Sequence, residues 1–417
     1  MKTKNNSQLH IVKSEKDPTD KIIDKIMIEL REEQEPIENL EEKIQEHKHR
    51  FWFRTITTVA LIVMVVGGTY MLIVNQTYSK AQVINAYKNQ EADNSQYARF
   101  SDGVLRYSKD GVSFLDTTGE EQWNLPCQFQ TPLVEVNQDS VVVADNGGNS
   151  IKVFQKDGLK GEIKTTLPIE KVAVSTQGIV SVILKNETSP QVVCYDATGN
   201  LLVELKASFS NNGYPVDIAL SDNGYILLVS YLSIKEGIAT TKIVYYNFSE
   251  EGQEVKDYQV KSDSYKNEVL PNAFFMNEDT SVIIGNASIL MYKGKQTPEL
   301  LKTIKVDKII KSSFHNQHYI GLILKNSDQE GYELRLYNKD GKKTLSKNFA
   351  GDYKHVQIEG NQVIMYDGTK CSVFSRTGIH KFEGELEMPI QEMFPLNGLN
   401  KYLVISTDGA EEIRFVK

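Results

Sequence analysis

The segment Asp102–Asn124, DGVLRYSKDGVSFLDTTGEEQWN, contains the pattern that decides the fold. Apolar and polar residues alternate in VLRY and again in VSFL, and short turns follow that contain Gly111 or Gly119. Alternation with a period of two predicts β-strands with one buried face. Asp-Gly and Thr-Gly pairs supply the positive φ that a tight antiparallel turn requires. The segment therefore predicts consecutive antiparallel strands joined by tight hairpins.

The same phrase recurs along the rest of the chain. Its seven copies end at Gly119, Gly158, Gly199, Gly252, Gly294, Gly341 and Gly378. Successive glycines are 37–53 residues apart with a mean of about 43, which is in the range of propeller blades. Two further apolar runs lie between consecutive phrases, as in PLVEV and SVVVAD. Four strands per repeat predict an all-β protein, a β-propeller of four-stranded antiparallel blades.

The repeats predict eight blades. Their first strands are expected to begin near Tyr97, Gln130, Ile169, Tyr214, Leu270, Val306, Lys354 and Pro389. The last repeat offers only a third strand, Glu412–Val416. Because an unpaired strand edge leaves backbone donors and acceptors without partners, we expect Ala81–Tyr87 (AQVINAY) to supply the missing strand and close the ring. Seven blades are the alternative if the short first unit forms no blade of its own.

An uncharged apolar stretch precedes the repeats. The 25 residues Thr55–Ser79 contain no Asp, Glu, Lys, Arg or His, and about 20 such residues cross a bilayer as a helix. A cleaved signal peptide fits less well, because the stretch starts about 50 residues into the chain and exceeds the usual apolar core of about 7–15 residues. We therefore expect one transmembrane helix over residues 51–79.

The charges that flank this stretch predict its orientation. Lys48, Arg50 and Arg54 precede it, whereas only Lys80 and Lys88 follow at a comparable distance, so the N-terminus is expected in the cytoplasm. The chain would then be a single-pass protein of the cell membrane with an extracellular C-terminal domain. The expected parts are a cytoplasmic segment (1–50), the transmembrane helix (51–79), a juxtamembrane linker with the ring-closing strand (80–96) and the propeller (97–417).

The cytoplasmic segment 1–50 is expected to be partly disordered, with short amphipathic helices. Ile23, Leu30, Ile37 and Ile44 follow one another at intervals of seven, as in a coiled-coil seam. One interpretation is a short coiled coil that gives weak dimerisation or binds a cytoplasmic partner. The other is a solvated pair of helices, interrupted where Pro36 starts the second one.

The run DGVLRYSKDGVSFLD and its copies resemble blades of pyrroloquinoline-quinone-type, WD40-like and outer-membrane-assembly-type propellers. More closely, the layout of residues 50–417 resembles an uncharacterised family of Firmicutes single-pass membrane proteins, known only as a domain of unknown function. The resemblance implies an extracytoplasmic propeller of the bacterial cell envelope. It implies no activity.

Composition argues against several classes of partner and cofactor. The chain has 417 residues with 47 Lys+Arg and 55 Asp+Glu, and the net charge of −8 argues against nucleic acid as its main partner. Cys127, Cys194 and Cys371 match no zinc pattern and are expected to be free thiols, two of them in buried strands. A quinone site would need several tryptophans, but only Trp123 follows the apolar stretch.

His315 and His318 are the one pair of histidines that suggests a metal. Two imidazoles bind a metal only where further ligands converge, so we interpret the pair as a polar turn between strands. We expect no catalytic residues, no cofactor and no metal site.

A binding surface is the favoured functional hypothesis. Loops that join the outer strand of one blade to the inner strand of the next all open on one face of a propeller. Four aromatic residues are expected in such loops and are the candidate partner-binding residues: Phe209, Tyr214, Tyr265 and Tyr353. The alternative is that these rings pack locally onto the blades. The insert Leu232–Thr241 is expected to widen the same rim or a neighbouring one.

These observations predict a membrane-anchored, non-catalytic binding or scaffolding module that presents its loops to a protein or glycan of the envelope. The alternative is an envelope enzyme acting on a glycan or a small cofactor at the channel mouth. An enzyme would show converging acidic or histidine side chains with displaced pKa values in one pocket.

Overall fold

The computed structural model describes residues 18–32, 37–88, 95–206, 212–327, 330–398, 400–407 and 409–417. It forms two compact units, Met1–Gln76 and Thr77–Lys417, and each is described by itself.

The first unit is helical. α1 spans Pro18–Glu32 and α2 spans Ile37–Val74. Within α2, Lys43–Val74 has a mean hydropathy of 2.2 over its most apolar window and is long and apolar enough to cross a membrane. The residues that follow Pro36 are mostly good helix formers and include no glycine or proline before residue 50. The helix therefore runs without a break across the boundary expected between residues 50 and 51. The helix ends at Val74, five residues before Ser79, where the transmembrane helix was expected to end.

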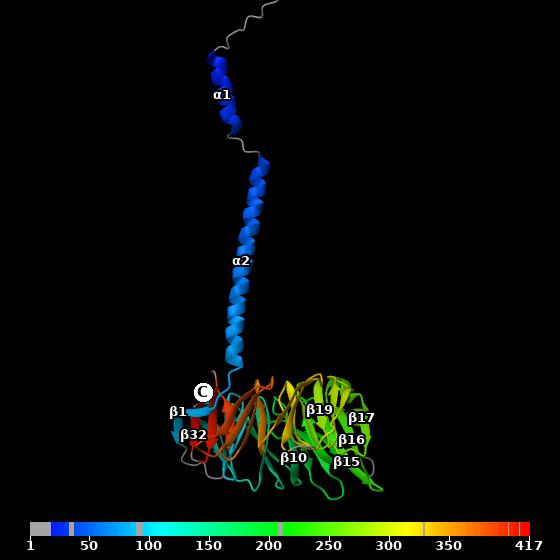
Figure 1. Cartoon of the computed structure of the whole chain (residues 1–417). Helices are drawn as coiled ribbons and strands as arrows, with labels where there is room; N and C mark the ends of the chain where they lie inside the picture. Colours follow the sequence, from blue (N-terminus) through cyan, green and yellow to red (C-terminus); the bar gives the residue numbers. More distant parts are fainter. Residues whose placement is uncertain are drawn as a thin grey trace, which may run out of the picture. The chain divides into compact units, whose positions relative to one another are not determined.

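The second unit is a β-propeller, as the repeats predict. Its eight sheets each contain four antiparallel strands, so the seven-bladed alternative is wrong. Figure 1 shows the sheets arranged side by side around the ring. In blades 1–7 the strands follow chain order from the centre of the ring outward. Two short helical turns, α3 (Glu250–Gln253) and η1 (Lys256–Tyr258), join the strands of blade 4.

The strands of the first four blades are the following. Blade 1 has β2 (Gln96–Phe100), β3 (Gly103–Tyr107), β4 (Gly111–Leu115) and β5 (Glu121–Pro126); blade 2 has β6 (Pro132–Asn137), β7 (Ser140–Asp145), β8 (Ser150–Gln155) and β9 (Gly158–Lys164); blade 3 has β10 (Ile169–Val174), β11 (Val180–Leu184), β12 (Gln191–Tyr195) and β13 (Leu201–Lys206); blade 4 has β14 (Tyr214–Leu220), β15 (Ile226–Lys235), β16 (Ile238–Asn247) and β17 (Gln259–Lys266).

The remaining blades complete the ring. Blade 5 has β18 (Asn272–Phe275), β19 (Thr280–Ile284), β20 (Ser288–Lys293) and β21 (Glu299–Lys305); blade 6 has β22 (Ile310–His315), β23 (Tyr319–Lys325), β24 (Tyr332–Asn338) and β25 (Lys343–Phe349); blade 7 has β26 (His355–Glu359), β27 (Gln362–Asp367), β28 (Lys370–Ser375) and β29 (His380–Glu385); blade 8 has β30 (Glu392–Pro395), β31 (Lys401–Ser406), β32 (Gly409–Val416) and β1 (Lys80–Lys88).

Blade 8 closes the ring with a strand from the other end of the propeller sequence. β1 is the outer strand of that blade and pairs antiparallel with β32, from Lys80 opposite Val416 to Lys88 opposite Gly409. A bulge between Val83 and Asn85 interrupts the register once. The predicted role of Ala81–Tyr87 as the closing strand is therefore confirmed.

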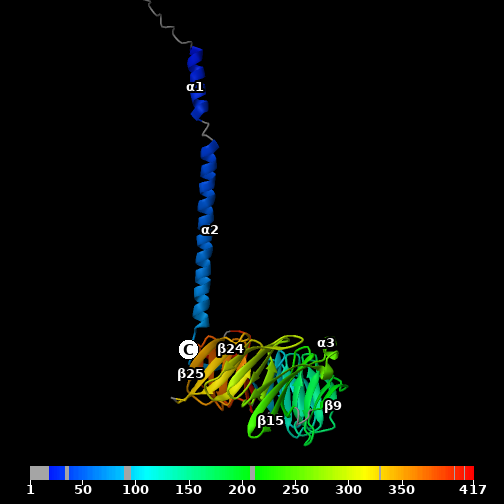
Figure 2. The same ribbon diagram turned by 90° about the vertical axis from the view of Figure 1, so that its right-hand side faces the viewer.

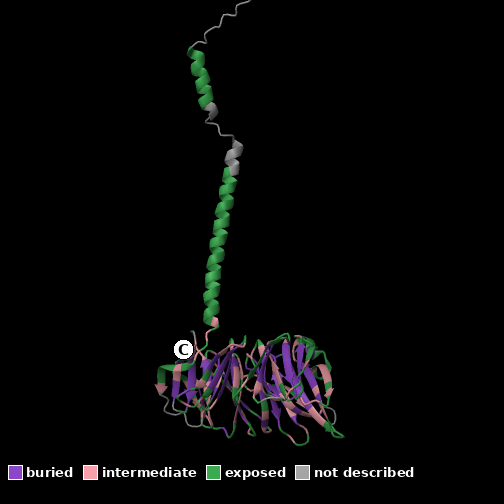
Figure 3. Ribbon diagram, viewed as in Figure 1, coloured by how far each residue is buried: buried purple, intermediate pink, exposed green. Residues whose placement is uncertain are grey.

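The core lies between neighbouring blades. All six residues of β7 are buried, and Val142 of this strand belongs to a cluster that includes Val172 and Val182 of blade 3. Figure 3 shows the same pattern throughout the ring, with buried residues along the middle strands. Cys194 and Cys371 are buried in β12 and β28, as expected for small apolar residues.

The insert Leu232–Thr241 lengthens one hairpin. It forms the distal part of β15 and β16, which are ten residues each. Figures 1 and 2 show this hairpin reaching past the lower edge of the ring. The side chain of Ile234 near its tip is 70% exposed.

Candidate functional site

A cavity of about 720 Å³ lies at one end of the central channel. Seven of the eight inner strands line it with residues near their C-terminal ends, where each inner strand turns into the second strand of its blade. The lining is both polar and apolar. It includes Arg99, Glu135, Asn137, Gln138, Val174, Leu220, Asp222, Phe274, His315, Gln317, His318 and Glu359. Because the walls come from seven rigid sheets, this cavity is a preformed feature of the ring.

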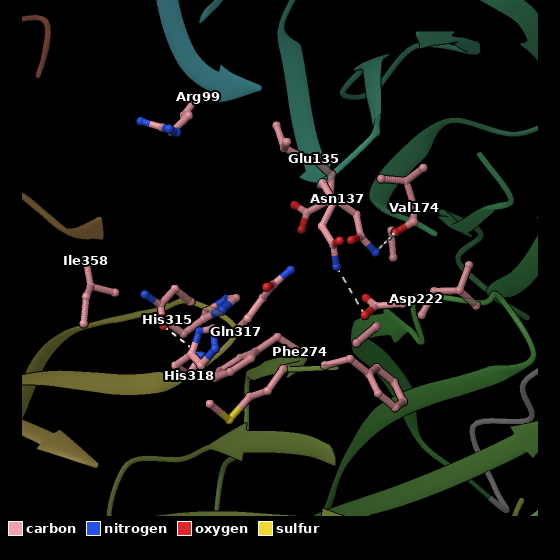
Figure 4. A pocket seen from close by; sticks show the side chains of 18 of the residues that line it. Arg99, Glu135, Asn137, Val174, Asp222, Phe274, His315, Gln317, His318 and Ile358 are labelled. Atoms are coloured by element: carbon pink, nitrogen blue, oxygen red, sulfur yellow. Dashed lines mark hydrogen bonds between the residues drawn. The ribbon is translucent and has the colours of Figure 1, made fainter. Parts of the chain in front are cut away.

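One wall carries carboxylates (Figure 4). Glu135 of β6 is exposed to the cavity, and desolvation within the ring of blades raises its pKa to about 7. The negative charge of Asp217 on β14 adds to the shift, whereas Lys171 on β10 opposes it. Lys171 itself lies 3.6 Å from the Asp217 carboxylate. The Lys171 ammonium group therefore interacts with two carboxylates, those of Asp217 and Glu135.

Asp222 lies further toward the mouth on the same wall, in the turn after β14. Burial raises its pKa, and hydrogen bonds from the side-chain amides of Asn137 and Gln138 lower it. The Gln138 Nε2 atom donates to Asp222 Oδ2 at 3.3 Å. Neutral amides therefore hold this carboxylate, and no cation is paired with it among the described residues.

Histidines and an aromatic ring form the wall across the cavity (Figure 4). The His315 imidazole stacks on the Phe274 ring with centroids 3.5 Å apart and planes 4° from parallel. His315 is exposed to the cavity, and desolvation within the ring of blades lowers its pKa to about 4, so its ring is neutral near pH 7. The side chain of Asn316 accepts hydrogen bonds from the backbone N–H groups of His318 and Tyr319 at 2.9 and 2.8 Å. The predicted polar turn is present and contains His318, whereas His315 is the last residue of β22.

On the third side of the cavity lies Arg99, the one lysine or arginine among the described lining residues. Arg99 of β2 lies 3.5 Å from the Glu359 carboxylate of β26 and 5.9 Å from the centroid of the Phe394 ring. Burial raises the pKa of Glu359, and the Arg99 charge lowers it. In the described part of the chain there is no group of three or more His, Cys, Asp or Glu arranged to hold a metal ion.

The charge of Glu135 is expected to make stability depend on pH. Its pKa of about 7 lies above the ordinary 4.5, so the folded chain binds this proton more tightly, and stability falls as pH rises from about 4.5 to about 7. Glu135→Gln should therefore be more stable than the native chain at pH 8 and nearly equal to it at pH 4. Thermal unfolding followed by circular dichroism measures this, with exposed Glu187→Gln as the control. Equal pH dependence of the native chain and Glu135→Gln would contradict the assignment.

The predicted partner-binding residues lie toward the other end of the channel. Tyr214 is the first residue of β14, Tyr265 lies near the end of β17, and Tyr353 lies between β25 and β26. Phe209 is outside the described residues. The Tyr214 hydroxyl donates to Glu170, the Tyr265 hydroxyl is 2.6 Å from that of Tyr292, and Tyr353 is buried in the core between blades 6 and 7. These contacts place each ring in a different local environment, and their role in partner binding stays a prediction.

Apart from His315 and His318, the cavity residues were not singled out from the sequence, although a signal was present. Three successive inner strands have a charged residue in the middle: Glu135 in PLVEV, Lys171 in IEKVAV and Asp217 in YPVDIAL. In a closed ring these positions lie on the strands that surround the channel. Alternation alone indicates that these side chains face solvent, but it does not distinguish the central channel from the outer surface.

Comparison with one solved structure, that of Sqt1, supports the fold. Sqt1 from Saccharomyces cerevisiae is 12% identical, with 81% of this chain and 100% of that chain covered and a TM-score of 0.53. BamB from Moraxella catarrhalis is 11% identical, with 80% and 99% covered and a TM-score of 0.47. No curated protein matches the chain. A family model matches residues 74–415, and the chain therefore belongs to the family of unknown function DUF5711.

Proposed function

We propose that the chain is a membrane-anchored, non-catalytic binding or scaffolding module of the bacterial cell envelope. In this proposal α2 is the anchor, the N-terminus is cytoplasmic, and the propeller lies outside the cell and binds an envelope protein or glycan. The observation that carries the proposal is the cavity of about 720 Å³ that seven blades build at one end of the channel. A concave site on a rigid scaffold is the usual place for recognition.

Crosslinking in cells tests this proposal. A photoreactive phenylalanine analogue is placed in the full-length chain at Gln317, which is exposed in the turn between β22 and β23 and lines the cavity. The control position is Glu187, exposed between β11 and β12. We expect a discrete captured neighbour from Gln317 and none from Glu187. Equal capture from both positions would contradict a specific site at the cavity.

A third crosslinking position distinguishes the two ends of the channel. Tyr214 accepts the aromatic analogue with little change in volume and represents the predicted partner-binding residues. Capture from Tyr214 alone would place the binding face at the end of the channel opposite the cavity. Capture from Gln317 alone would place it at the cavity. Capture from neither position above the Glu187 background would overturn the binding role.

An envelope enzyme remains the second candidate because a specific observation favours it. Glu135 with a pKa of about 7 and His315 with a pKa of about 4 line the same cavity. Displaced pKa values in one pocket are typical of general acid–base sites. An enzyme predicts that Glu135→Gln abolishes turnover of a captured glycan or small molecule while its binding persists. A binding module predicts no turnover by the native chain.

A further inference from the structure

Charge is unevenly distributed over the end of the ring that holds the cavity. This end consists of the turns that join the first strand of each blade to the second, and the third strand to the fourth. In blades 1–4 the described residues of these turns include 11 Asp or Glu but only 2 Lys or Arg. In blades 5–8 the described residues of these turns include 3 Asp or Glu and 4 Lys or Arg. Blades 1–4 are therefore strongly acidic at this end, and blades 5–8 are not.

Five exposed lysines gather at this end where blades 5 and 6 meet, and we call them the lysine cluster. They are Lys293 and Lys302 of blade 5 and Lys339, Lys342 and Lys343 of blade 6. The Lys302 Nζ atom donates to the Gly341 carbonyl at 2.8 Å, and Gly341 lies in the turn between β24 and β25. This bond brings the lysine of β21 next to the lysines of blade 6.

Few carboxylates balance the lysine cluster. Glu299 is the register partner of Lys293, but its carboxylate is bonded to Lys261 of blade 4 at 2.6 Å. Asp340 lies in the turn itself and accepts from the side-chain amide of Asn338 at 3.4 Å. None of the five lysines forms an ion pair with another described residue. Their positive charge is therefore available to an anion outside the chain.

Two exposed leucines lie beside these charges. Leu300 and Leu301 of β21 are 42% and 49% exposed and directly precede Lys302. Leu301 falls at the bulge in the pairing of β20 with β21, where it has no register partner. Leucines next to lysines suit the surface of a membrane, because the apolar side chains enter the acyl boundary while the ammonium groups meet anionic headgroups. A soluble anionic polymer would use only the lysines.

The chain enters the propeller at this same end. The backbone N–H of Tyr78 donates to the Lys381 carbonyl near the start of β29 at 2.8 Å. The side chain of Asn400, in the turn between β30 and β31, donates to the Tyr78 hydroxyl. α2 ends at Val74, and the four residue steps from there to Tyr78 span at most about 14 Å. The membrane that α2 is proposed to cross is therefore within reach of this end of the ring.

We propose that the lysine cluster, with Leu300 and Leu301, docks the propeller on anionic lipid headgroups of the membrane. The proposal rests on the membrane anchor proposed above and adds a second contact with the same membrane. Each lysine near an anionic surface strengthens the attraction by about fivefold. The acidic turns of blades 1–4 are repelled by that surface, so the contact selects one orientation of the ring.

Fluorescence in nanodiscs tests the proposal on the full-length chain. Leu301→Cys carries the environment-sensitive fluorophore NBD, and Cys127→Ser removes the partly exposed native cysteine. The discs contain neutral phosphatidylcholine, either alone or with about 30% anionic phosphatidylglycerol. We expect the emission of the label at position 301 to shift to the blue by about 10 nm or more in the anionic discs only. Equal emission in the two kinds of disc would overturn the proposal.

A second label position is the matched control. Leu201 is the first residue of β13, the outer strand of blade 3, and is 58% exposed. It is followed by a second exposed leucine and lies at a similar bulge, but it is far from the lysine cluster along the ring. The label in Leu201→Cys should emit at the same wavelength in both kinds of disc. Equal blue shifts at the two positions would contradict a contact confined to blades 5 and 6.

Charge variants locate the contact. The first variant combines three substitutions in the lysine cluster: Lys339→Gln, Lys342→Gln and Lys343→Gln. The control variant combines three substitutions of exposed lysines at the opposite end of the ring: Lys109→Gln, Lys185→Gln and Lys266→Gln. The first variant should lose the blue shift, because three such losses weaken the attraction by about a hundredfold, and the control variant should keep it. Circular dichroism verifies that both are folded. A blue shift that persists in the folded first variant would also overturn the proposal.

The same experiment separates this contact from the anchor. Incorporation of the native chain into both kinds of disc, with equal emission at position 301, would refute the lipid contact and leave the anchor intact. Failure of the native chain to enter either kind of disc would refute the anchor and the contact that rests on it. A blue shift that dextran sulfate produces in neutral discs would identify an anionic polymer as the partner and contradict the lipid assignment.

Discussion

Replacing Phe415 with alanine should lower the free energy of unfolding by about 3–5 kcal/mol. Phe415 lies in β32, the strand to which β1 pairs, and is 2% exposed. Its ring stacks on Phe382 of blade 7 with centroids 4.0 Å apart, and it contacts the tilted ring of Tyr402 with centroids 4.5 Å apart. Truncation removes these contacts and leaves a cavity where the closing blade meets its neighbour. Denaturant unfolding of the full-length chain measures the loss.

The adjacent residue provides the control. Arg414 is on the same strand, but its side chain is exposed, so Arg414→Ala should change the free energy of unfolding by no more than about 0.5 kcal/mol. A similar, small loss for both variants would mean that the closing blade contributes little to the stability of the ring.

Replacing Glu333 with alanine should cost a similar amount, about 3–5 kcal/mol, because it removes the buried carboxylate that is bonded to a buried cation. The side chains of Glu333 and Arg335 in β24 are only 6% and 10% exposed. Arg335 donates to both Glu333 carboxylate oxygens, at 2.5 and 3.0 Å, while Lys308 and Ser346 each donate at 2.7 Å. Loss of this one carboxylate removes a partner from each of the three donors and leaves the Arg335 guanidinium with the exposed Asp307 carboxylate.

The second carboxylate bonded to Arg335 is the matched control. Asp307 accepts from Arg335 Nη1 at 2.7 Å, but its side chain is 72% exposed. Water can replace a partner that is this exposed, so Asp307→Asn should cost less than about 1 kcal/mol. Equal losses for the Glu333 and Asp307 variants would contradict the assignment of the buried pair.

The same network predicts part of the acid sensitivity of the propeller. Burial raises the pKa of Glu333, but the hydrogen bonds from Arg335, Lys308 and Ser346 outweigh it and hold the pKa at about 2. Because this value lies below the ordinary 4.5, the carboxylate stabilises the fold above about pH 4.5 and its contribution is lost as pH falls toward 2. Glu333→Gln should lose less stability than the native chain over this range in parallel unfolding curves.

The sequence predicts the propeller well because its signals are local. Turn glycines and alternating strands recur in every blade, and two predicted blade starts, Ile169 and Tyr214, coincide with the first residues of β10 and β14. The predicted first residue of a blade is less accurate where the preceding turn is irregular. The sixth blade, for example, starts at Ile310 and not near Val306. Ring closure by Ala81–Tyr87 follows from counting strands.

The cavity could not be predicted in the same way, because it depends on closure. Glu135, Asp222 and His315 are far apart in sequence and come together only when seven inner strands surround one axis. Each of these residues has an ordinary local explanation as a polar strand position or a turn residue. The candidate aromatic residues were chosen by loop position, and the structure shows that Tyr353, one of them, packs into the core between two blades.

Disulfide formation across the closing strands tests the ring most directly. Gln82 in β1 and Arg414 in β32 are exposed register partners, so cysteines at these two positions should form an intramolecular disulfide under mild oxidation when Cys127 is replaced by serine. Cysteines at Gln82 and Glu411 should not, because Glu411 pairs with Ala86. A disulfide from the first pair alone is the predicted result. Failure of that pair, or equal crosslinking of both pairs, would contradict a ring closed by β1.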